Sequence, residues 1–248
     1  AIATKESPEE RIAAMYRTVF LRDPLPEEVE MGKQFVAQYG AAPPDAFAHP
    51  RWQYGYGPVN TETGALDSFT PLPHFTGSAW QGSDKIPDPQ LDWASLGAHG
   101  GHPGKPGLAV VRRWTAPYDT ELSMEGELRH ASDQGDGVFG YVISSASGII
   151  WQGHAHNQNI PTNFSAVPVK AGETIDLVLD CGANQSFDSF TWHPRLFVAE
   201  TVVAQVPAGN DNEWLSRVDF TGPPPPALEP WGKYAQVLLM SNEFMFVD

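Results

Sequence analysis

The chain has 248 residues and a formal net charge of −15 at pH 7. This balance argues against a nucleic-acid-binding protein, because phosphate contacts need basic patches. The only cysteine, Cys181, excludes an internal disulfide and a C-x-x-C-H motif for haem, and no apolar run approaches the ~20 residues of a membrane-spanning helix. A hydrophobic fraction of 41% with 23 Gly and 23 Pro, without a short repeat, favours a folded β-rich protein with many turns.

The first forty residues predict a helical hairpin. A helix is expected to begin at Pro8, because Ser7 can cap it and Glu10 completes a capping box. A second helix is expected from Pro26 or Glu27 to Tyr39, with Gly40 as its C-cap. Apolar residues recur at helical spacing in both segments, so the hairpin has a face that needs a partner.

From residue 41 onward, short runs of aromatic and β-branched residues alternate with turn residues. Strands are predicted near residues 52–56, 67–71, 77–81, 109–115, 121–129, 138–144, 148–153, 163–169, 174–181 and 187–197. In the 174–181 segment Ile175, Leu177 and Leu179 share one face, as in an antiparallel sheet with one buried side. The pattern predicts a jelly-roll β-sandwich, with residues 84–107 as a long ordered loop that packs on it.

The end of the chain returns to helix. Residues 222–226 are predicted to form a stiff polyproline spacer, and a last helix is predicted from Pro230, with Phe244 on its apolar side. The expected organisation is a helical hairpin (1–41), a β-sandwich (42–205), and a Pro-rich linker with a C-terminal helix (206–248) that packs on the hairpin. The sandwich would then be an insertion whose two ends meet.

Two segments combine an aromatic ring with polar side chains, as glycan recognition requires. One contains Trp80, Gln81 and Asp84; the other is a strand and loop that contain Trp151, Gln152, His154, His156 and Asn157. The alternative is that both tryptophans belong to the core and the polar residues are solvated turns. Trp114, Trp192 and Cys181 are predicted core residues.

Two metal hypotheses are open. His154 and His156 share one side of a strand, but no third ligand stands at a matching spacing for a transition metal. Asp180, Asn184 and Asp188 fall at four-residue steps and offer the oxygen ligands of a structural calcium ion. Asp133 and Asp136 form a second acidic turn. An ordinary Asn/Asp turn is the alternative for both acidic segments.

Catalytic motifs are missing from the sequence. It contains no G-x-S-x-G and no H-E-x-x-H, and carboxylates such as Glu121 and Glu125 alternate outward on predicted strands. We therefore expect no enzymatic activity, although a catalytic pair built from segments far apart in the chain would leave no motif in the sequence.

The terminal segments carry a resemblance to a known family. Residues 10–28 (ERIAAMYRTVFLRDPLPEE) and 231–248 (WGKYAQVLLMSNEFMFVD) resemble the C-terminal region of large planctomycete-type proteins of unknown function that accompany c-type cytochrome domains. The segments FTPLP (69–73), GGHP (100–103) and RWTAP (113–117) resemble a domain inserted in some members, and VKAGETID (169–176) resembles a segment of carbohydrate-binding-like sandwiches. The resemblance implies a periplasmic or cell-envelope location and haem-bearing domains outside this chain.

Together these expectations describe a non-catalytic polysaccharide- or oligosaccharide-binding module of a larger envelope protein. A structural domain that assembles with the rest of its parent protein, without binding glycan, is the main alternative. A polysaccharide-active enzyme is the third. No nucleic-acid partner and no membrane span are expected.

Overall fold

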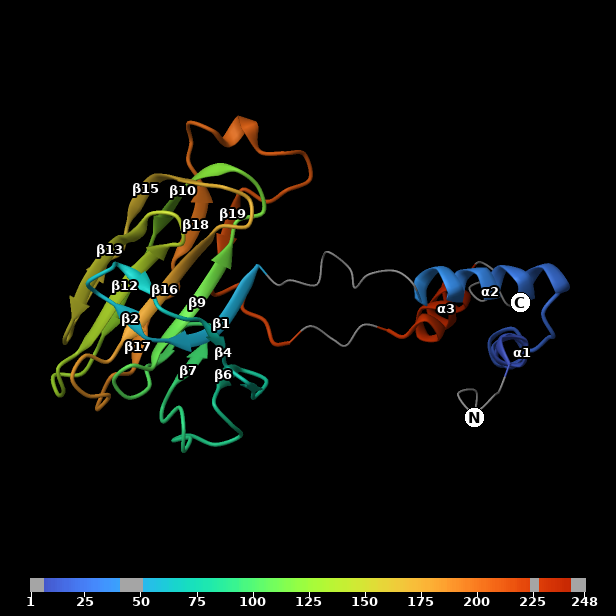
Figure 1. Cartoon of the computed structure of the whole chain (residues 1–248), viewed down its shortest axis with the longest axis horizontal. Coiled ribbons are helices and arrows are strands. Elements are labelled where there is room, and N and C mark those ends of the chain that lie inside the picture. Colours follow the sequence, from blue (N-terminus) through green and yellow to red (C-terminus); the bar gives the residue numbers. More distant parts are fainter. Residues whose placement is uncertain (1–6, 41–50, 224–227, 242–248) are drawn as a thin grey trace. The chain divides into compact units, whose positions relative to one another are not determined.

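The computed structural model describes residues 7–40, 51–223 and 228–241. The chain divides into two compact units. The helical unit comprises residues 1–49 and 224–248, and the β unit comprises residues 50–223. Each unit has a hydrophobic core of its own, so each is described by itself (Figure 1).

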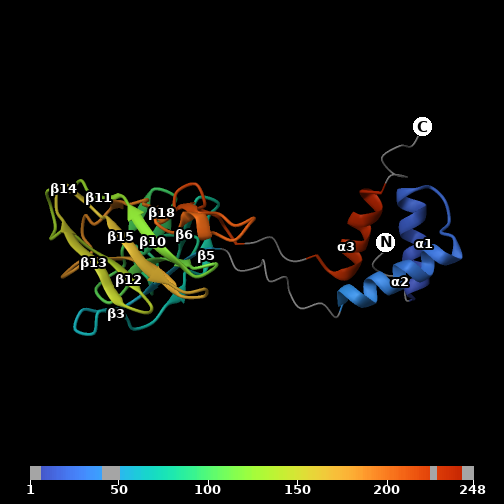
Figure 2. The same ribbon diagram turned by 90° about the horizontal axis from the view of Figure 1, so that it is seen from above.

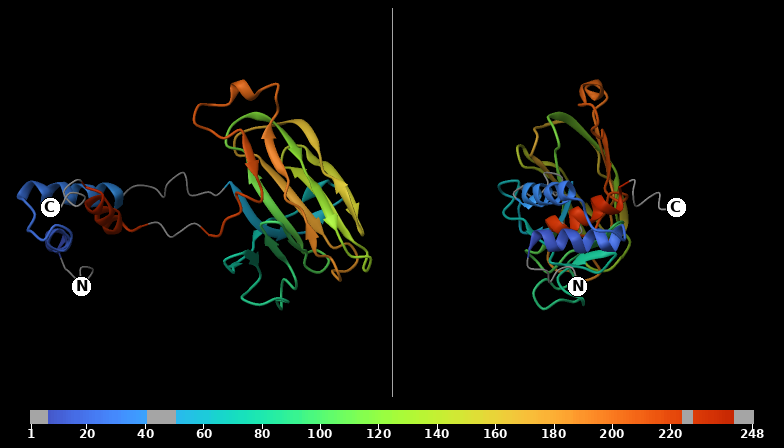
Figure 3. Two further views of the ribbon diagram at one scale, coloured as in Figure 1. Left: turned by 180° about the vertical axis from the view of Figure 1, so that it is seen from behind. Right: turned by 90° about the vertical axis from the view of Figure 1, so that its right-hand side faces the viewer.

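The helical unit consists of α1 (Pro8–Val19), α2 (Pro26–Gly40) and α3 (Pro230–Leu239), which lie side by side (Figure 3). Its core is built from Ile12, Met15, Tyr16, Tyr234 and Leu238. Two of these residues come from α3, which confirms the prediction that the C-terminal helix packs on the hairpin. Within the described residues no helix is long and apolar enough to cross a bilayer. The predicted apolar residue Phe244 lies outside the described residues.

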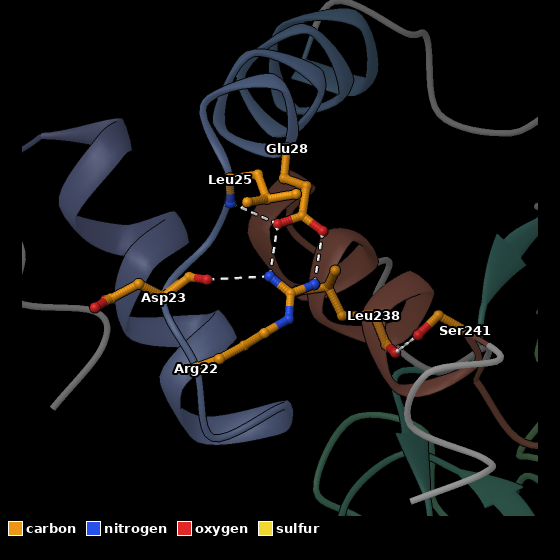
Figure 4. Close-up of polar contacts among 6 residues, drawn as sticks. All are labelled: Arg22, Asp23, Leu25, Glu28, Leu238 and Ser241. Carbon is orange, nitrogen blue, oxygen red and sulfur yellow. Dashed lines mark hydrogen bonds and ion pairs between the residues drawn. The ribbon is translucent and has the colours of Figure 1, made fainter.

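The two N-terminal helices begin with different caps. The Ser7 Oγ accepts a hydrogen bond of 3.2 Å from the backbone N–H of Glu10, as predicted. The residue before α2 is Leu25, which has no capping side chain, and its N–H instead donates to Glu28 Oε2 at 2.6 Å. The Arg22 guanidinium donates to both oxygens of the same carboxylate, at 2.7 and 2.8 Å (Figure 4). These hydrogen bonds, led by those from Arg22, lower the pKa of Glu28 and fix the turn between the helices.

The β unit begins at Trp52. Its strands in chain order are β1 (Trp52–Gly57), β2 (Val59–Asn60), β3 (Ala65–Leu66), β4 (Thr70–Pro71), β5 (His74–Phe75), β6 (Ala79–Gln81), β7 (Ser95–Gly97), β8 (Gly100–His102), β9 (Ala109–Thr115), β10 (Thr120–Glu125), β11 (Glu127–His130), β12 (Val138–Ser144), β13 (Gly148–Ala155), β14 (Gln158–Pro161), β15 (Phe164–Val169), β16 (Thr174–Asp180), β17 (Phe190–Thr191), β18 (Arg195–Val198) and β19 (Glu213–Leu215).

All of these strands except β2 and β3, which pair only with each other, form two layers (Figures 1 and 2). One layer is a large sheet with the order β13-β12-β16-β9-β1-β4. The other layer consists of a short sheet, β15-β10-β18-β19, and a long sheet, β14-β11-β17-β8-β7-β6-β5. Strand pairs within each sheet are antiparallel, and the chain passes between the two layers in jelly-roll fashion. The predicted β-sandwich is therefore confirmed.

The core between the layers follows from the alternation of side chains along the strands. On the large sheet Val142, Leu177 and Val110 point inward with Trp52 and Trp114, and all five are at most 2% exposed. From the opposite layer, the inward residues include Leu122, Leu128, Trp192, Leu196 and Trp214. The predictions that Trp114, Trp192 and Cys181 are buried are confirmed.

Three predictions about the chain's organisation need correction. Residues 84–107, expected to be a loop, contain β7 and β8, whose Gly100 and Gly101 permit close strand pairing. The domain boundary expected at 205/206 lies later, because β19 pairs with β18 and buries Trp214 in the core. The strands expected at 121–129 and 187–197 are each divided in two.

Candidate functional site

A group of aromatic and polar side chains lies on the outer face of the large sheet, and we call it the outer-face patch. It consists of Phe139 and Tyr141 from β12 and Gln152, Gly153 and His154 from β13, and it lines a shallow depression of about 290 Å³. The strand register places Phe139 opposite His154 and Tyr141 opposite Gln152. Since the pleat sends alternate residues to the same face, these four side chains share the outer face.

The imidazole of His154 has a fixed position in this patch. Its ring stacks on Phe139 with centroids 4.3 Å apart and an interplanar angle of 14°. Its Nε2 lies 2.6 Å from the backbone carbonyl oxygen of Asp136. Because a carbonyl oxygen can only accept, Nε2 is the donor in this hydrogen bond.

The outer face of the large sheet is open only in part. The β2–β3 hairpin and its flank cover the remainder, where Val59, Leu66 and Phe69 pack on Val111 and Val178. In contrast, Gln152 and His154 are exposed, and Phe139 and Tyr141 are half-buried. Solvent therefore reaches the patch.

The segment around Trp80 has a different environment. The Trp80 indole N–H donates to the carbonyl oxygen of Thr221 at 2.8 Å, and its ring packs against Tyr54 and Phe75. Gln81 is buried and donates to the Ser83 carbonyl oxygen at 2.7 Å. Asp84 is exposed on the following turn. The structure thus favours the alternative in which Trp80 is a core-packing residue.

Trp151 also points inward, where its ring centroid lies 6.0 Å from that of Trp192. His156 follows the end of β13 and stacks on the buried His130, with centroids 5.9 Å apart, so it does not share a site with His154. Asn157 is exposed at a turn and its N–H donates to His130 Nδ1. Of the eight residues predicted to bind ligand, the patch contains Gln152 and His154.

The sequence motifs did not identify Phe139 and Tyr141 as candidate ligand-binding residues. The alternation in Val138-Phe139-Gly140-Tyr141-Val142 is the signal for them, because it puts both rings on the face opposite the buried valines.

The acidic segments predicted to bind calcium lie beside the patch. Asn184 donates to Asp136 Oδ1 at 3.0 Å, which joins the two acidic turns that the sequence separates. The N–H of Gly182 donates to Asp180 Oδ1 at 2.7 Å. Asp188 is fully buried, and neither of its carboxylate oxygens has a hydrogen-bond partner. Across the described parts of the chain, no group of three or more His, Cys, Asp or Glu side chains is arranged to hold a metal ion.

A second, larger depression of about 510 Å³ lies on the outer face of the short sheet. Phe197, Phe164, Glu125 and Asn163 line it. The aromatic face of Phe197 is occupied, since the Arg195 guanidinium lies 4.3 Å above the ring centroid.

No known protein family matches the chain. A search of curated proteins also finds no match. Among solved structures, the chain is similar to the C-terminal CBM6 of LamC, a marine laminarinase from Zobellia galactanivorans, at 14% identity and a TM-score of 0.21, over 37% of this chain and 80% of that one. A TM-score this low supports no conclusion, so the fold assignment rests on strand order and register. The resemblance of the terminal segments to planctomycete-type proteins stays a prediction.

Proposed function

We propose that the β unit is a non-catalytic module that binds a polysaccharide or oligosaccharide through the outer-face patch. The observation that carries the proposal is the placement of the Tyr141 and Phe139 rings beside the exposed Gln152 and His154 on one face of the large sheet. Aromatic rings stack on the C–H faces of sugars, and amide and imidazole groups bind the hydroxyls.

The shape of the patch supports a chain-like ligand. The depression is shallow and lies along two neighbouring strands, so a sugar chain can rest on it without being enclosed. The side chains that line it offer an amide, a phenol and an imidazole. These groups match neutral hydroxyls on a sugar better than a charged ligand, which would need an opposite charge.

The same residues support a binding role over a catalytic one. The patch lining contains no carboxylate, and the His154 Nε2 is already bound to a backbone carbonyl. Glycoside hydrolysis commonly uses two carboxylates that flank the scissile bond, and the residues that line the patch provide neither. The setting in a larger envelope protein with cytochrome domains rests on the terminal resemblance alone and belongs to this proposal.

Affinity electrophoresis of the full chain through gels that contain single soluble polysaccharides tests this function. We expect one or more of them to retard the protein, and Tyr141→Ala to weaken the interaction about tenfold, since aromatic contacts contribute ~1 kcal/mol beyond their area. Gln152→Ala is expected to act in the same direction.

Phe197→Ala is the matched control, because it removes an outer-face ring from the other layer. If no polysaccharide retards the protein, the glycan proposal is wrong. That result would favour the alternative of a structural domain that assembles with the rest of its parent protein. If Phe197→Ala abolishes retardation while Tyr141→Ala does not, the short sheet carries the site.

A further inference from the structure

Two exposed aromatic residues, Trp93 and Phe187, lie at one end of the long sheet, and we call them the loop-end pair. Trp93 stands two residues before β7 and is 40% exposed, and Phe187 stands three residues before β17 and is 55% exposed. Both strands pair antiparallel with β8, which lies between them, so both begin at the same end of the sheet (Figure 1). The two rings therefore come from neighbouring loops.

The loop that carries Trp93 is anchored on the rest of the β unit. On either side of Trp93, the residues Leu91 and Ala94 are buried in the core. The side-chain amide of Gln185, in the loop before β17, donates to Asp92 Oδ2 at 2.7 Å. The two loops are thus joined directly, and the exposure of the Trp93 ring belongs to a packed loop.

The loop that carries Phe187 is held from the interior by His130. This histidine is 0% exposed, and its Nε2 donates to the carbonyl oxygen of Phe187 at 2.9 Å. Its Nδ1 accepts from the N–H of Asn157, which directly precedes β14, at 3.3 Å. Because a carbonyl only accepts and an N–H only donates, one buried imidazole holds two loops by two hydrogen bonds.

The backbone of these loops is unusual. Three of the five non-glycine residues with a positive φ in the described parts of the chain belong to them: Asp92 at +56°, Asn157 at +50° and Phe187 at +71°. A positive φ is disfavoured by the Cβ atom and is an outlier for a bulky side chain such as that of phenylalanine. Conformations of this kind persist where the surroundings impose them, and they cluster at ligand-binding sites.

Hydrogen-bonding groups accompany the two rings. The imidazole of His102, at the end of β8, lies with its ring centroid 6.0 Å from that of Trp93. Burial lowers the pKa of His102, so this imidazole is neutral at pH 7. The carboxylate of Asp92 and the amide of Gln185 meet between the two loops. Aromatic rings beside such groups suit a sugar, whose C–H faces stack on the rings and whose hydroxyls need hydrogen-bond partners.

We propose that the loop-end pair forms a second sugar-binding site of the β unit. Its two rings stack on sugar faces, and the polar side chains beside them bind the hydroxyls, namely His102, Gln185 and Asp92. Because the loops are already held in place, little conformational freedom is lost on binding. The ligand class is that of the proposed function, while the site needs no contribution from the outer-face patch. On one polysaccharide the two sites would reinforce each other, since the second contact is intramolecular.

Affinity electrophoresis of the full chain tests this site, in gels that contain soluble starch, xylan, galactomannan or a soluble β-glucan. Trp93→Ala and Phe187→Ala are each expected to weaken the interaction with the retarding polysaccharide about tenfold. Combining Trp93→Ala with Tyr141→Ala should weaken it more than either substitution alone. Val218→Ala is the control, because it shortens another exposed apolar side chain of the β unit, and it should be retarded as the parent is.

The outcomes separate this site from the outer-face patch. Full retardation of both Trp93→Ala and Phe187→Ala, with weakening by Tyr141→Ala, would overturn the loop-end site and leave the patch. Weakening by the two loop-end substitutions but not by Tyr141→Ala would support the loop-end site and overturn the patch. Absence of retardation of the parent chain in every gel would overturn both. An equal effect of Val218→Ala would also overturn the loop-end site, because the loss would then not depend on the two rings.

Discussion

Asp188 is the residue whose chemistry depends most on its tertiary surroundings. In sequence it is one of 30 acidic residues. In the fold, burial raises its pKa to about 7, and Asp136 and Asp180 add to the effect. Burial likewise raises the pKa of Asp180.

This shift predicts how stability depends on pH. The pKa of Asp188 is higher in the folded state than its ordinary value of 3.8, so the folded state binds the proton more tightly. The resulting stabilisation is complete below pH 3.8 and is lost as pH rises through about 7. Chemical denaturation at a series of pH values measures it, and Asp188→Asn should flatten this dependence. A parallel pH profile for the parent and the variant would contradict the prediction.

Arg112 is a second residue whose role only the structure reveals. It is 2% exposed, and its guanidinium donates to the carbonyl oxygens of Gly97, at 2.8 Å, and Ser216, at 3.2 Å. Its neighbour Arg113 is less buried and binds Asp176 through two hydrogen bonds of 2.7 and 2.8 Å. The two adjacent arginines thus make hydrogen bonds on opposite faces of the large sheet. The alternation of side chains along β9 explains why they face opposite ways, but it does not identify their partners.

At the scale of elements, the division of the second layer is the feature that organises the sandwich. The chain is interrupted at Gly126 between β10 and β11, and at Thr162 between β14 and β15. These interruptions are side by side, since the N–H of Thr162 donates to the Gly126 carbonyl oxygen at 2.9 Å. Asn163 Oδ1 accepts from the N–H of Gly126. The strands end at a common level, so the layer divides into a short and a long sheet.

Thr162 is expected to stabilise this division. It is fully buried, and its Oγ1 accepts a hydrogen bond of 3.0 Å from the Trp192 indole N–H. Thr162→Val keeps the shape but leaves that N–H buried without an acceptor, and we expect a loss of about 1–3 kcal/mol in the free energy of unfolding. Thr191→Val, an exposed position on β17, is the control and should change stability by no more than about 0.5 kcal/mol. Equal effects of the two substitutions would rule out this role for Thr162.

At the scale of the whole molecule, the two units have separate cores, and this separation predicts separate unfolding. Ile12 is fully buried in the helical unit, and Ile12→Ala should destabilise that unit by about 2–5 kcal/mol. The loss should appear in the helical circular dichroism signal. Tryptophan fluorescence should hardly change, because seven of the eight tryptophans belong to the β unit.

Val237→Ala is the control within the same unit, because Val237 is 48% exposed on α3. It should leave both signals nearly unchanged. If Ile12→Ala shifts the fluorescence transition as much as the helical one, the two units unfold as one.

The sequence alone was sufficient for the features that depend on near neighbours in the chain. The Ser7 cap, the apolar spacing around Ile12 and the alternation of Ile175, Leu177 and Leu179 are local patterns, and each predicts its element correctly. The tertiary structure decided which strands become neighbours, because pairing joins residues far apart in the chain. Only the register brings Tyr141 beside Gln152, and only the packed fold buries Asp188 without a hydrogen-bond partner for its carboxylate. Trp80 and Trp151 turn inward for the same reason: their burial depends on the opposite layer, which no local pattern describes.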